Sequence, residues 1–192
     1  MTRRILTGVN VLSVRSHTEA MVYVLRSDCR ACHSRNRDVT DDLEARDGTV
    51  NASYTSFCRD CGNIDVHTFR LPDHDPQGDD PGVVFGGSEP STVIDAGQWL
   101  RFARQTAVGG PVEPNGLAEA ERASAALAMR AAAAAVREVV KFLEPGVERL
   151  PRSAMFTDEG REEFDRDPWQ FSRERLAVVE NAYRTAAERL AG

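Results

Sequence analysis

The hydrophobic pattern divides the chain into a β-like first part and a helical second part. Within residues 1–71, β-branched and aromatic residues gather in the short runs "EAMVYVLR", "ASYTSF" and "DVHTFRL", which predict strands. The N-terminal stretch "MTRRILTGVNVLSV" is also typical of a strand. The segment "RNRDVTDDLEARDGTVN" is polar, so it predicts a long solvated loop with a hairpin-turn signal at Asp47-Gly48.

Residues 91–192 show the spacing of amphipathic helices. Asp95 and Gln98 have the spacing of a capping box, which predicts a helix with an apolar face that includes Trp99. The alanine-rich run over residues 117–143 has no interior Gly or Pro and predicts a long helix. Ser172 is the predicted N-cap of a last helix, whose apolar seam comprises Leu176, Val179, Tyr183, Ala186 and Leu190. We expect an antiparallel helical bundle that leaves this seam or the Trp99 face open to a partner.

Residues 72–90 separate the two parts by composition. They hold four prolines, four glycines and five acidic residues without a Lys or Arg, which is typical of an acidic Pro/Gly linker, although "VVF" within them can dock on a neighbouring element. The predicted fold class is therefore α+β: a small β-rich module over 1–71, the linker over 72–90 and an all-α helical bundle over 91–192. No apolar run approaches the roughly 20 residues that span a bilayer, so we expect no membrane partner.

The four cysteines of the chain form two pairs, Cys29 with Cys32 in "CRACH" and Cys58 with Cys61 in "CRDCG". Two residues between the thiolates let one tight turn direct both sulfurs at one ion, and two such turns complete the tetrahedral set that Zn²⁺ prefers. The sequence therefore predicts one structural Zn²⁺ with four thiolate ligands. These pairs and their β-rich flanks resemble zinc-ribbon domains over about the first 70 residues, a resemblance that implies fold and metal but no particular task.

Two other roles for the cysteines are weaker. Cys29, Cys32 and His33 also spell the CxxCH motif of haem attachment, but that role leaves Cys58 and Cys61 unexplained. Disulfides form in oxidising compartments, whereas the sequence shows no secretion signal, which predicts a reducing, cytoplasmic location.

Charge and motifs define the functional expectation. Residues 1–37 carry seven arginines against Glu19 and Asp28, but the whole chain has a net charge of −6. The sequence contains none of the common motifs for a nucleophile, a phosphate loop or a catalytic metal. We therefore expect a non-enzymatic, cytoplasmic adaptor, regulator or assembly subunit that contacts another protein, or itself, through the helical bundle. The first alternative is a nucleic-acid-associated accessory factor that uses the Arg-rich face, and the second is an enzyme with an unrecognised site.

Overall fold

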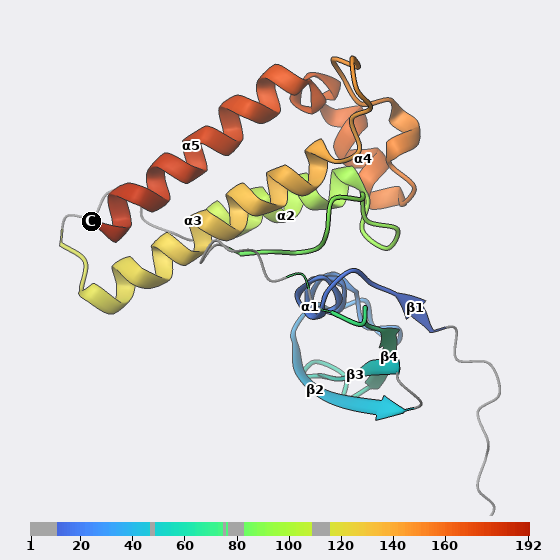
Figure 1. The fold of residues 1–192 in the computed structure, drawn as a ribbon. Coiled ribbons are helices and arrows are strands. Elements are labelled where there is room, and N and C mark those ends of the chain that lie inside the picture. Colours follow the sequence, from blue (N-terminus) through green and yellow to red (C-terminus); the bar gives the residue numbers. More distant parts are fainter. Residues whose placement is uncertain (1–10, 47–48, 75, 77–82, 109–115) are drawn as a thin grey trace, which may run out of the picture. The chain divides into compact units, whose positions relative to one another are not determined.

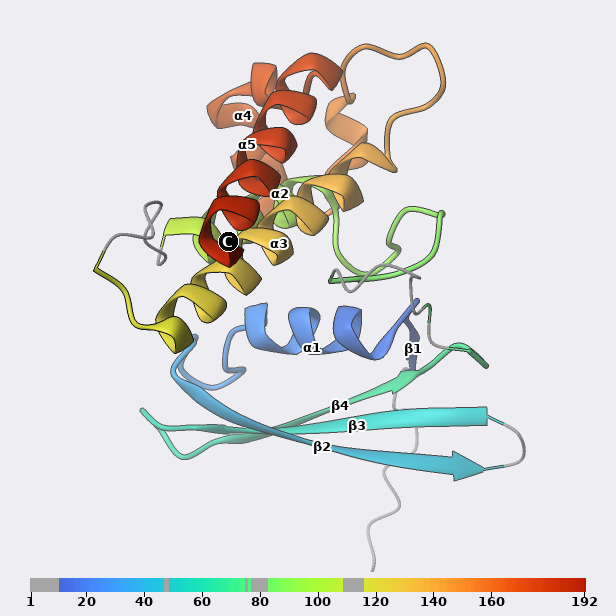
Figure 2. The ribbon, with the colours of Figure 1, turned by 60° about the vertical axis from the view of Figure 1, so that its left-hand side comes forward.

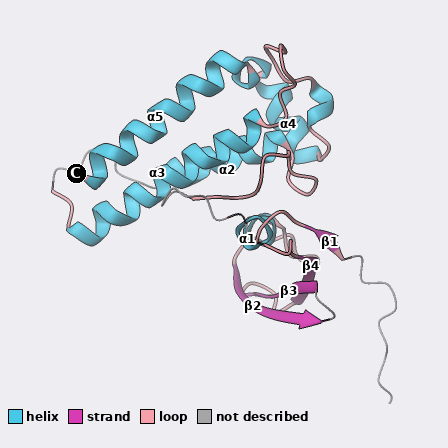
Figure 3. Ribbon diagram, viewed as in Figure 1, coloured by secondary structure: helices cyan, strands magenta, loops and turns pink. Residues whose placement is uncertain are grey.

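The computed structural model describes residues 11–46, 49–74, 76, 83–108 and 116–192. The chain divides into two compact units, Met1–Pro76 and Gln77–Gly192, and each is described by itself (Figure 1). The first unit contains a four-stranded sheet and one helix, and the second consists of helices and the segments that join them (Figure 3). The fold is therefore mixed α and β.

The sheet of the first unit contains β1 (Leu12–Ser13), β2 (Arg37–Arg46), β3 (Thr49–Cys58) and β4 (Ile64–Arg70), in the order β1-β4-β3-β2. Strands β2, β3 and β4 are antiparallel, and β1 runs parallel to β4. Helix α1 (His17–Arg26) lies across one face of the sheet, while β2 forms its edge (Figure 2). The core of this unit contains the fully buried side chains of Val24, Tyr54 and Phe69.

The strand predicted for "EAMVYVLR" is wrong, because these residues belong to α1. The Ser16 hydroxyl accepts the backbone N–H of Glu19 at 2.9 Å, and the Glu19 carboxylate accepts the backbone N–H of Arg15 at 2.7 Å. These contacts cap the first turn, so local capping and packing on the sheet outweigh the β propensity of Val22 and Val24.

The solvated loop predicted between the cysteine pairs is also wrong, because most of it forms β2. This strand pairs with β3 along its whole length, from Arg37 opposite Cys58 to Arg46 opposite Thr49. An edge strand remains in contact with water, so a polar sequence is compatible with it. The predicted turn at Asp47-Gly48 and most of the predicted N-terminal strand lie outside the described residues, and only Leu12–Ser13 of that strand form β1.

The second unit contains α2 (Ala96–Val108), α3 (Glu119–Val140), α4 (Asp158–Arg166) and α5 (Arg173–Ala191), with the 3-10 turns η1 (Arg152–Ala154) and η2 (Pro168–Phe171). Helix α3 packs against both α2 and α5. The capping box before α2 is confirmed, because the Asp95 carboxylate accepts the Gln98 N–H at 2.9 Å and Gln98 Oε1 accepts the Asp95 N–H at 3.2 Å. Ser172 caps α5 as predicted.

The two faces that we expected to remain open are largely internal. The side chains of Leu176 and Leu190 in the predicted seam are buried, and the latter belongs to a core cluster with residues of α3. Trp99 is fully buried and lies 4.9 Å, between ring centroids, from Phe85 of the "VVF" sequence. The end of the predicted linker thus contributes to the core of the second unit. Among the described residues, no helix combines the length and the apolar character that a membrane span requires.

Candidate metal centre

Two loops of the same design carry the four cysteines. The first follows α1, and the second joins β3 to β4. In each loop, the N–H of the residue after the second cysteine donates to the carbonyl of the first: His33 to Cys29 and Gly62 to Cys58, both at 2.9 Å. Both donors adopt a positive φ, 58° at His33 and 75° at Gly62. This left-handed turn folds each CxxC sequence back so that both of its sulfurs point to the same side.

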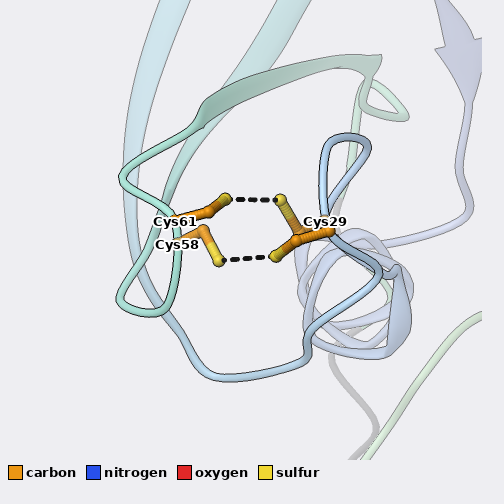
Figure 4. Close-up of side chains that lie close together, drawn as sticks. Cys29, Cys58 and Cys61 are labelled. Carbon is orange, nitrogen blue, oxygen red and sulfur yellow. Dashed lines mark hydrogen bonds between the residues drawn. The ribbon is translucent and has the colours of Figure 1, made fainter.

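The loops bring the four sulfurs into one cluster, with all four Sγ atoms within 4.8 Å of one another. The Sγ–Sγ distance is 3.6 Å both between Cys29 and Cys61 and between Cys32 and Cys58 (Figure 4). A disulfide needs about 2.05 Å between its sulfurs, and all four cysteines are free. The cluster can therefore hold a metal ion, and among the described residues it is the sole group of three or more His, Cys, Asp or Glu arranged to do so.

The electrostatics of the cluster act in opposite directions on the pKa values of Cys29 and Cys32. Backbone N–H groups of Ala31 and Cys32 lower the pKa of Cys29 to about 6. A backbone hydrogen bond from Ser34 favours the thiolate of Cys32, but the neighbouring thiols and desolvation raise the pKa of Cys32 to about 12. A bound cation removes this conflict, because it stabilises every thiolate that it contacts.

Hydrogen bonds between the two loops support the cluster. The carboxylate of Asp60, in the second loop, accepts hydrogen bonds from the Ser34 hydroxyl and, at 2.8 Å, from the Asn36 amide. These two donors lower the pKa of Asp60. The backbone N–H of Arg59 donates to the carbonyl of Asn36 at 2.9 Å. The second loop is thus tied to the segment that follows the first.

Arg37, the first residue of β2, connects the sheet to the end of α1. Its side chain is 2% exposed, and its guanidinium donates to the carbonyls of Val24, at 2.6 Å, and Ser27. It also donates to the Ser56 hydroxyl at 3.2 Å and lies 3.9 Å from the carboxylate of Asp65. The cation satisfies carbonyls at the C-terminus of the helix, where positive charge is favourable. The sequence pattern did not reveal this role, and it counted Arg37 only among the seven arginines of residues 1–37.

The histidines contribute nothing to the cluster. The side chain of His33, which the CxxCH sequence made a candidate, is exposed and lies outside the four-sulfur group. His67 is half-buried on β4 and stacks on Phe69 with ring centroids 6.5 Å apart. Burial lowers the pKa of His67, and the charges of Arg30 and Arg37 lower it further.

Comparison with known proteins finds no match: no family model, no curated protein and no solved structure is significantly similar to the chain.

Proposed function

We propose that the chain is a non-enzymatic interaction protein, an adaptor, regulator or assembly subunit of the cytoplasm, whose first unit is a zinc ribbon that holds one structural Zn²⁺. The observation that carries the metal assignment is the group of four sulfurs within 4.8 Å of one another. A tetrahedral Zn²⁺ with Zn–S bonds of about 2.3 Å separates its sulfurs by roughly 3.8 Å. The two Sγ–Sγ distances of 3.6 Å are close to that spacing.

A structural role follows from the number of ligands. Four thiolates from the protein fill the tetrahedron and leave no position for a water or substrate. The buried carboxylates of the chain also have structural partners. Glu19 pairs with Arg15, Glu163 with Arg104 and Arg166, and Glu138 with Lys141, while Asp95 caps α2 and binds Thr157. These contacts support a protein that works through its surfaces.

The helical unit offers a surface for a protein partner at Trp169. Its side chain is 70% exposed, and with the 54% exposed Val178 it lines an open pocket of about 290 Å³. The guanidinium of Arg149 lies 5.0 Å from the centre of the Trp169 ring. Large, exposed tryptophans are common hot spots of protein interfaces. This surface replaces the seam and the Trp99 face as the proposed contact of the helical half.

The nucleic-acid alternative receives less support. Its basic face required free arginines near the cysteines, but Arg35 pairs with Asp28 at 2.6 Å, Arg30 lies 3.9 Å from Asp65, and Arg37 is buried. Arginines that are neutralised within the protein release fewer counterions on binding phosphate.

Chelator titration tests the role of the metal. Both tryptophans, Trp99 and Trp169, belong to the second unit, so their fluorescence reports on the folding of that unit. We expect zinc removal to unfold the first unit, seen as loss of its dispersed NMR signals, while tryptophan emission stays unchanged. Tryptophan emission that changes together with the NMR signals would contradict a metal role confined to the first unit.

Affinity capture from the native host tests the partner surface. Wild-type protein, a Trp169→Ala variant and a Leu127→Ala control at another exposed apolar side chain are compared. We expect a specific partner to be retained by the control and lost with Trp169→Ala. Equal capture by all three proteins would contradict the proposed surface.

A further inference from the structure

Strand β2 presents an open sheet edge. It is the last strand in the order β1-β4-β3-β2, and its ten residues contain neither Gly nor Pro. In an antiparallel pair, alternate residues direct their backbone groups toward the neighbouring strand. The bond from the Arg59 N–H to the Asn36 carbonyl fixes this alternation. Residues 39, 41, 43 and 45 consequently turn their N–H and C=O groups away from β3, where the described residues place no other strand.

Between Asp38 and Glu44, the charged side chains on one face of this edge are all acidic. Asp38, Asp42 and Glu44 all lie at even-numbered positions, so they share the face away from α1. The register places them opposite Phe57, Ser53 and Asn51 of β3, respectively. Asp38 is paired with Arg59 at 2.8 Å, whereas Asp42 and Glu44 have no ion pair among the described residues. The other face of the edge has Leu43, which is 54% exposed.

We propose that the β2 edge binds an extended basic segment of another protein, which adds to the sheet as an antiparallel strand. Backbone hydrogen bonds would form at positions 39, 41, 43 and 45. Residues opposite Asp42 and Glu44 would then stand at non-hydrogen-bonded positions, where side chains of neighbouring strands approach most closely. The segment should therefore have Lys or Arg at alternate positions and an apolar residue opposite Leu43.

A second copy of this chain fits the edge poorly. If two β2 strands paired antiparallel about Asp41, Asp38 of each would face Glu44 of the other. Like charges directly opposite one another destabilise a strand pair. The charge pattern therefore favours a basic partner strand over self-association.

This inference deepens the proposed interaction role, since it names a partner chemistry and a contact in the first unit. The test uses the full chain with zinc bound and a ten-residue peptide in which Arg alternates with Val and Thr. A control peptide has the same composition but groups its arginines in one block. We expect the alternating peptide to shift the amide NMR signals of residues 39, 41, 43 and 45, and to bind at least tenfold more tightly than the control.

Charge reversal tests the pairing itself. The double variant Asp42→Lys with Glu44→Lys changes two exposed side chains, so we expect it to fold and to lose binding at least tenfold. A peptide with Glu in place of Arg should bind this variant and not the wild type. Leu43→Pro removes an outward N–H and should weaken binding, while Leu43→Thr retains that N–H and should bind more tightly than the proline variant.

The inference would be overturned by equal binding of both basic peptides, by amide shifts outside the β2 edge, or by unchanged affinity after charge reversal. Loss of peptide binding in Trp169→Ala would move the contact to the helical unit. That outcome would refute the β2 edge but leave the proposed interaction role intact, so the two failures are distinguishable.

Discussion

Replacement of Arg37 by Met should destabilise the first unit by about 3 kcal/mol. The substitution keeps an unbranched side chain but removes a buried cation that donates to Val24, Ser27 and Ser56. A hydrogen bond to a charged group contributes roughly 1.5–3 kcal/mol, and removing one partner from a buried ionic network costs about 3–5 kcal/mol. We take the lower end, because Asp65 still accepts the backbone N–H of Arg30 at 3.2 Å.

The assay is urea denaturation of the zinc-bound protein at a fixed free zinc concentration, followed by the amide NMR signals of the first unit. Arg35→Met is the matched control, because Arg35 pairs with Asp28 while both side chains remain more than 40% exposed. Such surface pairs contribute about 0–1 kcal/mol. A loss below about 1 kcal/mol for Arg37→Met, or equal losses for both variants, would refute the role of Arg37 at the end of α1.

Three further predictions concern backbone strain, close packing and pH. His33→Gly should stabilise the zinc-bound first unit by up to about 1 kcal/mol, and Gly62→Ala should destabilise it similarly, because both positions have a positive φ; urea midpoints that move the other way would contradict this. Gly160→Ala should destabilise the second unit by about 2–4 kcal/mol, since its Cβ would overlap the Asp95 carboxylate, whereas Gly87→Ala has open space; equal thermal midpoints for the two variants would contradict this close packing at Gly160. His67 has a lowered pKa in the folded state, so the unfolded chain takes up its proton first and stability should fall as pH drops through about 6.5. His67→Phe should reduce that fall in urea denaturation at pH 8 and pH 5.5, and an identical pH dependence would exclude His67 as its source.

The features that sequence predicted well are local ones. Two residues between cysteines fix a turn that directs both sulfurs to one side, and the Asp95–Gln98 box and the Ser172 cap also depend on a few neighbouring residues. These contacts join residues only a few positions apart, so their spacing in the sequence indicates them.

The errors arose where tertiary context decides. The run around Val22 and Val24 has strand propensity, yet it is a helix because the Ser16 cap and packing against the sheet stabilise that form. Strand β2 is charged because it is an edge, a position that no local pattern reveals. The role of Arg37 depends on carbonyls 10 and 13 positions away in sequence, so composition alone assigned it to a basic surface.

The metal content of the purified protein tests the central claim most directly. Elemental analysis and native mass spectrometry of protein prepared without chelator should find one zinc per chain, because four thiolates form one site. Cys58→Ser should lose the zinc and unfold the first unit while the tryptophan emission of the second persists, and His33→Gly should retain the metal. Iron at the site, a haem absorption band, or a folded first unit without metal would contradict the account.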